Sequence, residues 1–309
     1  MPSIEIAGVA RIGQAVGYLG ATMQALGDMD FLHAAAGMLV GMLVGLTGVG
    51  GGSLMTPLLV LMFGVSPHTA VGTDLLYAAM TKITGSAVHG WRDTVDWKIV
   101  RRLALGSIPA ALLTLATLSY VGKVGKSSEN VILLSLAVLL GITSLAVLFR
   151  DRLIRFAHGL DPHKPPRQVQ LSTTLLGAVI GVAVTISSVG AGAIGMTVLL
   201  VLYPRLPVAR IVGSDIAHAV PLALIAGTGH WLIGGVDSVL LVNLLIGSIP
   251  GVIVGSLLST RAPDRILQPL LAVVLALSAW QLAVKALTPE AAKHAQREPV
   301  TAAARARSA

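Results

Sequence analysis

The sequence contains no cysteine and little charge. Without cysteine, the chain can form no disulfide, no thiolate metal site and no cysteine nucleophile. Asp, Glu, Lys and Arg make up only 12% of the 309 residues, whereas hydrophobic residues make up 54%. A soluble domain of this length needs more charge to cover its surface. The mean hydropathy of +0.82 therefore favours an all-α polytopic membrane protein, whose helices satisfy their backbone hydrogen bonds internally.

The sequence also lacks motifs for hydrolysis, metal binding and nucleotide binding. No metal-ligand spacing occurs at His33, His68, His158 and His163, and no His-Glu-x-x-His motif occurs in the sequence. Ser188 has no evident base partner, and no Gly-Lys-Ser/Thr follows the glycine runs. We therefore expect no enzyme, no cofactor and no metal. The net charge of +8 lies mainly in loops and a basic tail, as the positive-inside rule predicts, so we expect no nucleic-acid partner.

Apolar segments fill most of the chain, five on each side of one long polar stretch. They lie near 31–48, 53–64, 69–90, 100–120 and 131–149, and then near 171–189, 193–203, 208–233, 239–259 and 266–287. We predict a first transmembrane repeat (31–149), a polar linker (150–170) and a second transmembrane repeat (171–288). Residues 1–30 form an N-terminal segment in which an interfacial helix is one option, and we expect the polar tail 289–309 to be disordered.

The two halves repeat one another in sequence. Residues 41–56 align with 181–196, and Pro67 aligns with Pro207. One residue is then gained in the second half. The later matches are Asp74 with Asp215, His89 with His230, Asp96 with Asp237, and an identical Gly-Ser-Ile-Pro tetrapeptide at 106–109 and 247–250. Paired aspartates, paired histidines and a shared tetrapeptide in the same order indicate an internal repeat.

The second segment of each half is too short to cross a bilayer upright. A helix of about a dozen residues is roughly 18 Å long, whereas the hydrocarbon core is about 30 Å thick. The short segment forms either a re-entrant hairpin, leaving three crossings in each half, or a double crossing, giving five. Because both counts are odd, we predict two inverted-topology repeats with broken or re-entrant short helices.

Loop charges support the inversion independently. Lys and Arg occur in the loops 91–102 and 204–210, but not in 64–69 or 232–238. Equivalent loops of the two halves are therefore expected on opposite sides of the membrane. We place 91–102, 150–170, 204–210 and 260–265 in the cytoplasm.

Glycines interrupt the apolar segments at equivalent places and predict part of a substrate site. Where glycine lets the backbone break inside the membrane, the N–H groups of the next helix point into a cavity and favour an anion. Close helix packing is the alternative. The predicted substrate-binding positions are Gly50, Gly51, Gly52, Ser53, Gly190 and Gly192.

Polar side chains inside the apolar segments complete the predicted site. Intramembrane charges are costly and commonly functional. We predict that Thr73, Lys82 and Ser214 bind the substrate. Asp74, Asp215 and His218 are predicted to serve in proton coupling or ion pairing. Structural capping or pairing is the alternative, and Ala223 stands at the position of Lys82 in the second half.

The order and duplication of these motifs resemble the sulfite exporter TauE/SafE family. The resemblance rests on Pro57 after the glycine break, residues 70–76, residues 94–97 and the two Gly-Ser-Ile-Pro tetrapeptides, and it spans roughly residues 32–285. It implies a multi-pass protein of the cell inner membrane that carries sulfite, organosulfonates or related sulfur oxyanions, driven by an ion gradient.

We expect a secondary transporter that works by alternating access, with a small anionic substrate and the lipid bilayer as partners. A homo-oligomer is compatible with the sequence. The alternatives are a cation/proton exchanger that uses Asp74 and Asp215, and a non-transporting membrane scaffold.

Overall fold

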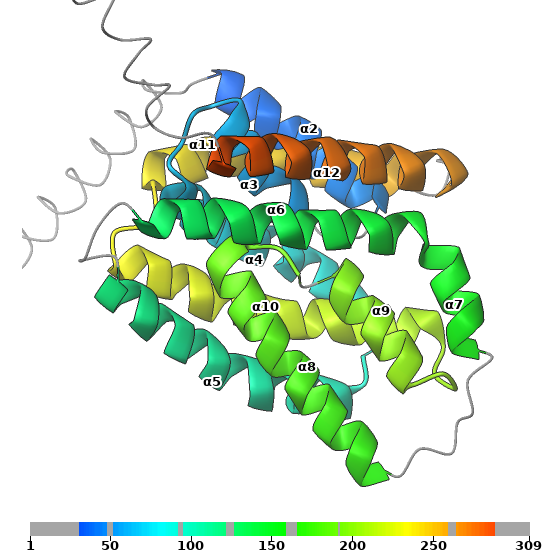
Figure 1. Ribbon diagram of the computed structural model, residues 1–309. Helices are drawn as coiled ribbons and strands as arrows, with labels where there is room; N and C mark the ends of the chain where they lie inside the picture. Colours follow the sequence, from blue (N-terminus) through cyan, green and yellow to red (C-terminus); the bar gives the residue numbers. More distant parts are fainter. Residues whose placement is uncertain are drawn as a thin grey trace, which may run out of the picture.

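The chain forms a bundle of helices (Figure 1). The computed structural model describes residues 31–47, 52–91, 95–121, 127–158, 166–190, 192–258 and 264–287, and no strand occurs among them. The N-terminal segment 1–30, the tail 289–309, Gly50 and Gly51 lie outside the described residues, as do the side chain of Ser53 and the loop 259–263.

Each half contributes five helices, in the predicted order. The first half holds α2 (Phe31–Thr47), α3 (Gly52–Leu61), α4 (Pro67–Trp91), α5 (Trp97–Val121) and α6 (Ser127–Leu148). The second half holds α8 (Pro166–Ser187), α9 (Ala193–Leu202), α10 (Val208–Leu232), α11 (Ser238–Leu258) and α12 (Asp264–Leu287). Six of the described helices, namely α5, α6, α8, α10, α11 and α12, are long and apolar enough to cross a membrane. The chain is a multi-pass α-helical membrane protein, as predicted.

The polar linker contains a helix of its own, α7 (Arg150–His158), which the sequence analysis did not predict. Five charged or histidine residues of this stretch alternate with apolar residues at helical spacing. The helix is therefore amphipathic, and it packs against the short helix α9.

The short helices α3 and α9 are ten residues long each, or about 15 Å, so neither crosses the bilayer upright. The break before α9 contains three positive φ angles, 58° at Ser188, 124° at Gly190 and 123° at Gly192. Only glycine adopts angles near 120° without strain, which explains the two glycines. The predicted broken helices are present in both halves.

The most extensive helix–helix packing joins one half to the other. Helix α2 packs along α11, and α8 packs along α5. Glycines make both contacts close, because a Cβ added at Gly106 would overlap the carbonyl of Thr174, and one added at Gly247 would overlap the carbonyl of Ala34. Thr174 and Ala34 are themselves equivalent in the repeat. The Gly-Ser-Ile-Pro tetrapeptides are therefore points of close packing between the halves.

In two further pairs, each helix packs against its own counterpart in the other half. Helix α4 packs on α10 and α6 packs on α12, and Figure 1 shows α6 and α12 running side by side. Equivalent loops lie at opposite ends of the bundle: Arg205 in the α9–α10 loop shares a pocket with Arg102, whereas Gly235, after α10, packs against His68 at the start of α4. This arrangement agrees with the inversion, whose orientation in the bilayer stays a prediction.

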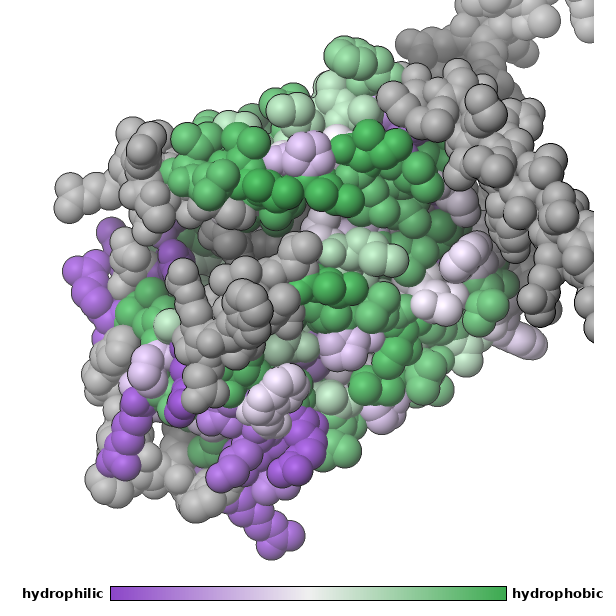
Figure 2. Space-filling view, turned by 180° about the vertical axis from the view of Figure 1, so that it is seen from behind, coloured by the Kyte–Doolittle hydropathy of each residue, from purple (hydrophilic) through white to green (hydrophobic). Residues whose placement is uncertain are grey.

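The outer surface has the polarity that a bilayer requires. Large apolar side chains such as Leu113 and Leu257 are more than 70% exposed (72% and 73%), and green hydrophobic residues cover the flank of the bundle in Figure 2. Hydrophilic side chains gather at one end of the same view. Lipid therefore contacts the flank, and water meets the charged end.

Candidate functional site

Helices α4 and α10 pack against each other and carry the two carboxylates that are buried among the described residues. Asp74 is 0% exposed and Asp215 is 3% exposed. The carboxylates occupy equivalent positions in the repeat, one on each helix, and each faces the short helix of its own half. Burying an ionisable group inside a membrane protein is costly, so this pair defines the centre of the candidate site.

Asp74 accepts hydrogen bonds from the first turns of α3. The backbone N–H of Thr56 donates to Asp74 Oδ2 at 3.2 Å, and the hydroxyl of Thr56 donates to the same oxygen at 2.5 Å. Ser188, at the break before α9, lies beside the same carboxylate, although its hydroxyl makes no hydrogen bond to a described residue. The negative charge at the N-terminal end of α3 is thus supplied by the protein itself.

Asp215 holds the equivalent place at α9 but lacks these bonds. A Cβ added at Gly195 would lie 2.6 Å from Asp215 Oδ1, so the carboxylate packs directly against the first turn of α9. Met196 stands where the first half has Thr56 and offers no hydroxyl. Asp215 Oδ1 is accordingly buried without a hydrogen-bond partner among the described residues, as is Asp74 Oδ1.

Lys82 lies two turns beyond Asp74 on α4 and is partly buried. Its ammonium interacts electrostatically with Asp215 and, less strongly, with Asp74. The structure therefore brings together the three charged residues that the sequence singled out. Ala223 occupies the position of Lys82 in the second half. One ammonium therefore interacts electrostatically with two carboxylates.

His218 lies one turn from Asp215 on α10 and is fully buried. Its Nε2 hydrogen-bonds with Ser107 Oγ on α5 at 2.7 Å, while its Nδ1 has no hydrogen-bond partner in the described part of the chain. Tyr77 on α4 is the equivalent residue in the repeat. It is also buried and lies near Ser248 on α11, the equivalent of Ser107.

Sequence reasoning missed Thr56, Ser107, Tyr77 and Ser248. The internal repeat could have identified some of them. A residue at the repeat position of a predicted site residue, or of its partner, is itself a candidate for the same cluster. Polar side chains at such positions inside apolar segments are exceptional, and this test would have identified Tyr77 from His218.

Thr73 and Ser214 make reciprocal contacts between the halves. The backbone N–H of Asp237 donates to Thr73 Oγ1 at 3.1 Å, and the backbone N–H of Asp96 donates to Ser214 Oγ at 2.8 Å. Asp96 and Asp237 themselves cap the starts of α5 and α11. Each hydroxyl thus holds the loop before a helix of the opposite half. Their predicted contact with substrate stays a prediction.

The predicted glycines lie where the short helices begin. Gly52 is the first residue of α3, and Gly192 is the N-cap of α9, where no side chain caps the helix. Gly190 lies within the break. Their positions next to the aspartates agree with a site built at two helix starts, and substrate contact at these glycines stays a prediction.

The chemistry of the cluster is that of proton and charge exchange. Two carboxylates, one ammonium, one imidazole and several hydroxyls lie between α3, α4, α5, α9 and α10. Within the described part of the chain, no group of three or more His, Asp or Glu side chains could hold a metal ion. The unpaired polar atoms at this centre can accept protons or receive a small polar solute.

Comparison with known proteins gives a consistent result. The profile of the family described as "Sulfite exporter TauE/SafE" matches residues 33–282. The chain is 39% identical to a protein of Bacillus subtilis (strain 168) named "Probable membrane transporter protein YjnA", over 80% of this chain and 96% of that protein. It is 28% identical to "Probable membrane transporter protein YdhB" of the same organism, over 74% of this chain and 90% of that protein.

A similar protein also occurs in Xylella fastidiosa (strain 9a5c). It is named "Probable membrane transporter protein" and is 27% identical over 73% of this chain and 83% of its own length. No solved structure is significantly similar to the chain.

Proposed function

The chain belongs to the sulfite exporter TauE/SafE family, and from this membership we propose that it is a secondary transporter of small sulfur-containing anions. Sulfite, organosulfonates and related oxyanions form the substrate class, and the cell inner membrane is the site of action. Proton movement drives the transport. We infer a carrier rather than an enzyme because the similar proteins are named as probable membrane transporters and the polar centre holds groups that exchange protons and charge.

The observation that carries the proposal is that Lys82 lies within electrostatic range of two carboxylates. Each carboxylate keeps one buried oxygen without a hydrogen-bond partner among the described residues. In the absence of a solute, the carboxylates compensate the ammonium and the positive ends of α3 and α9. A small oxyanion needs the same positive groups. The anion and the ionised carboxylates therefore compete for one set of partners.

Competition of this kind couples anion binding to proton binding. When Asp74 or Asp215 takes up a proton, the ammonium of Lys82 and a helix start lose their internal counter-charge, and an external anion replaces it. When the proton leaves, the carboxylate displaces the anion. His218, with one ring nitrogen unpaired, is placed to pass protons along α10.

The helix pairing suggests which parts move during alternating access. We call the close contacts of α2 with α11 and of α5 with α8, where Gly247 and Gly106 lie, the glycine seams. They are so close that each helix pair acts as one rigid unit. The site lies on α4 and α10, which pack on each other between these seams. We propose that α4 and α10 shift against the seams and expose the centre to each side in turn.

Flux measurements in proteoliposomes test this function. Purified protein is reconstituted, a pH gradient is imposed, and the movement of sulfite is followed in the wild type and in Lys82→Met. We expect Lys82→Met to lower sulfite flux by about tenfold or more, the effect of losing about 1.4 kcal/mol of anion affinity. Lys98→Met removes an exposed lysine at the start of α5 and should leave the flux unchanged.

The cation/proton exchanger is a second candidate, favoured by one observation: two carboxylates face a single ammonium. It predicts Na⁺-dependent or Ca²⁺-dependent proton flux that is lost in Asp74→Asn and Asp215→Asn and does not require sulfite. Sulfite-independent flux of that kind, with no sulfite movement, would overturn the anion proposal. A scaffold would show neither flux.

A further inference from the structure

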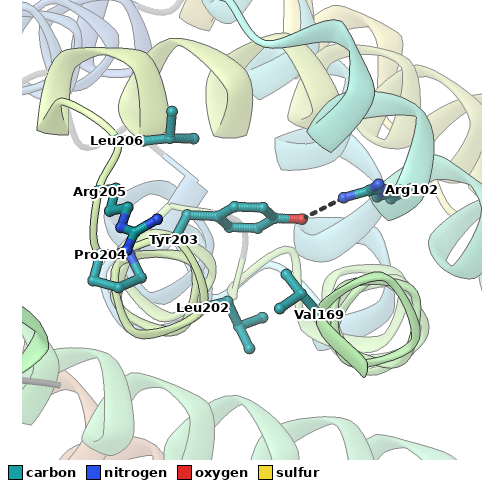
Figure 3. A pocket seen from close by; sticks show the side chains of 7 residues that line it. All are labelled: Arg102, Val169, Leu202, Tyr203, Pro204, Arg205 and Leu206. Carbon is teal, nitrogen blue, oxygen red and sulfur yellow. Dashed lines mark hydrogen bonds between the residues drawn. The ribbon is translucent and has the colours of Figure 1, made fainter. Parts of the chain in front are cut away.

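A second polar site lies away from the Asp74 cluster, at the charged end of the bundle. A cavity of about 260 Å³ opens where α5, α8 and α10 begin and α9 ends. Figure 3 shows the ring of Tyr203 crossing this cavity, with its hydroxyl directed at Arg102 and with Arg205 on the other side. Apolar side chains complete the lining, namely Val169, Leu202 and Leu206.

A chain of hydrogen bonds fixes the position of Arg102. Arg102 Nη1 donates to the hydroxyl of Tyr203 at 3.2 Å. That hydroxyl lies 2.8 Å from Thr173 Oγ1, which in turn donates to the carbonyl of Val169 at 2.7 Å. Tyr203 therefore donates to Thr173, and all three side chains are held by one continuous network. The guanidinium has five N–H donors, so most of them are still available.

The two arginines carry charge that the described residues do not neutralise. Neither Arg102 nor Arg205 forms an ion pair with a described carboxylate. Arg102 is partly buried and Arg205 is exposed. The two guanidinium groups line the same cavity from opposite ends of the Tyr203 ring, so an oxyanion in the cavity can bind to either cation.

The equivalent place in the other half has no arginine. The repeat places Asn243 at the position of Arg102, Val65 at that of Arg205, and Phe63 at that of Tyr203. Phe63 stacks on His33 with ring centroids 4.4 Å apart, where the second half has the Tyr203–Thr173 hydrogen bond. The fold therefore does not require the arginines, and the basic cavity exists at one end of the bundle only.

We propose that this cavity is a binding site for an oxyanion, and that its occupant is the phosphate of an anionic phospholipid. The cavity lies at the end of three apolar spans, where headgroups meet the protein, and tyrosine is typical of that depth. Arginine binds phosphate through paired N–H donors. Val169, Leu202 and Leu206 supply apolar lining on both sides of the Tyr203 ring, as acyl chains require and a free hydrated anion does not.

This site is separate from the Asp74 cluster and does not rest on the proposed function. It agrees with the predicted cytoplasmic location of the loops 91–102 and 204–210, since basic pockets between transmembrane helices on that side bind anionic headgroups.

Native mass spectrometry of the full chain tests the site. The protein is released from bilayers of phosphatidylglycerol and phosphatidylcholine in equal parts, and the phosphatidylglycerol molecules retained are counted. We expect Arg205→Gln, Arg102→Gln and the double variant to lose one retained phosphatidylglycerol, with affinity lowered about tenfold for each single variant. Arg102→Lys keeps the charge and should retain much of the binding. Arg205 is exposed, so its variant is expected to fold.

Arg101→Gln is the matched control, because Arg101 is exposed, adjacent to Arg102 and outside the cavity. Equal phosphatidylglycerol retention by the control, the single variants and the wild type would overturn the proposal. A second measurement separates lipid from a free oxyanion. If sulfite or sulfate raises the melting temperature in neutral detergent, and Arg205→Gln abolishes that shift, the cavity binds a free anion and the lipid assignment is wrong.

Discussion

Asp215 lies within electrostatic range of Lys82, and its Oδ1 is buried with no hydrogen-bond partner among the described residues. Its counterpart Asp74 is hydrogen-bonded twice by Thr56. The two halves thus hold equivalent carboxylates in different ways, one by a hydroxyl and a backbone N–H, the other by an ammonium on the opposite half. Because of this difference, variants of Lys82 and Asp215 can distinguish a structural role of Lys82 from a role in transport.

Replacing Lys82 by Met should lower both stability and flux. Breaking a buried charge pair costs on the order of 3 kcal/mol, and partial exposure of Lys82 lowers that figure. In the double variant Lys82→Met/Asp215→Asn the unpaired carboxylate is gone, so the melting temperature should recover. Flux should stay as low as in Lys82→Met, because the anion still lacks its cation. Recovery of flux together with stability would show that Lys82 serves only as a structural partner.

Removing the hydroxyl of Thr56 should destabilise the protein through Asp74. We expect Thr56→Val to cost about 1–3 kcal/mol, since a buried carboxylate loses a donor, and Thr56→Ser to cost much less. Thermal unfolding in detergent measures both. The complementary change Met196→Thr places a hydroxyl near Asp215 and should reduce the loss of stability caused by Lys82→Met. No effect of Met196→Thr in that background would contradict the equivalence of the two positions.

Alanine substitutions at the glycine seams should destabilise the protein, whereas a glycine outside the seams should tolerate alanine. Gly106→Ala and Gly247→Ala introduce a Cβ that overlaps a backbone carbonyl of the neighbouring helix, so each should cost about 1–3 kcal/mol. Gly141→Ala in α6 is the control, because a Cβ there meets nothing within 4 Å. Its stability should be unchanged or slightly raised, since alanine favours a helix by up to about 1 kcal/mol. Equal effects at Gly106 and Gly141 would contradict the close packing.

Variants of Thr73 and Ser214 can show whether their hydroxyls stabilise the structure or bind substrate. If each only holds a loop of the other half, Thr73→Val and Ser214→Ala should lower stability by about 1 kcal/mol each and leave the KM for sulfite unchanged. A raised KM without loss of stability, restored by Thr73→Ser, would instead support the predicted contact with substrate.

The order and length of the helices could be predicted from the sequence because apolar runs and the breaks between them are local properties. The segment 208–233 became α10 (Val208–Leu232), and 53–64 became α3 (Gly52–Leu61). Helix α7 was missed, since its charge suggested a linker while its amphipathic spacing was not considered. Asp74, Asp215 and Lys82 were identified because charges inside apolar segments are exceptional.

The partners of these residues were not predictable in the same way. Thr56 is an ordinary threonine in an apolar segment, and only the fold places it against Asp74. The glycine patterns indicated close contacts but not their partners, so the pairing of α2 with α11 and of α5 with α8 was invisible in the sequence. Long-range pairing depends on three-dimensional complementarity, whereas hydrophobic periodicity records only burial.

That pairing has a consequence for biosynthesis. When the ribosome has released the first half, α2 and α5 are already in the bilayer, but α11 and α8, against which they pack, have not yet been made. Two glycine-lined surfaces then face lipid, and the nascent protein has no finished tertiary core. A fragment ending within the linker, expressed by itself, should therefore be cleared by membrane proteases, whereas separately expressed halves should rescue each other.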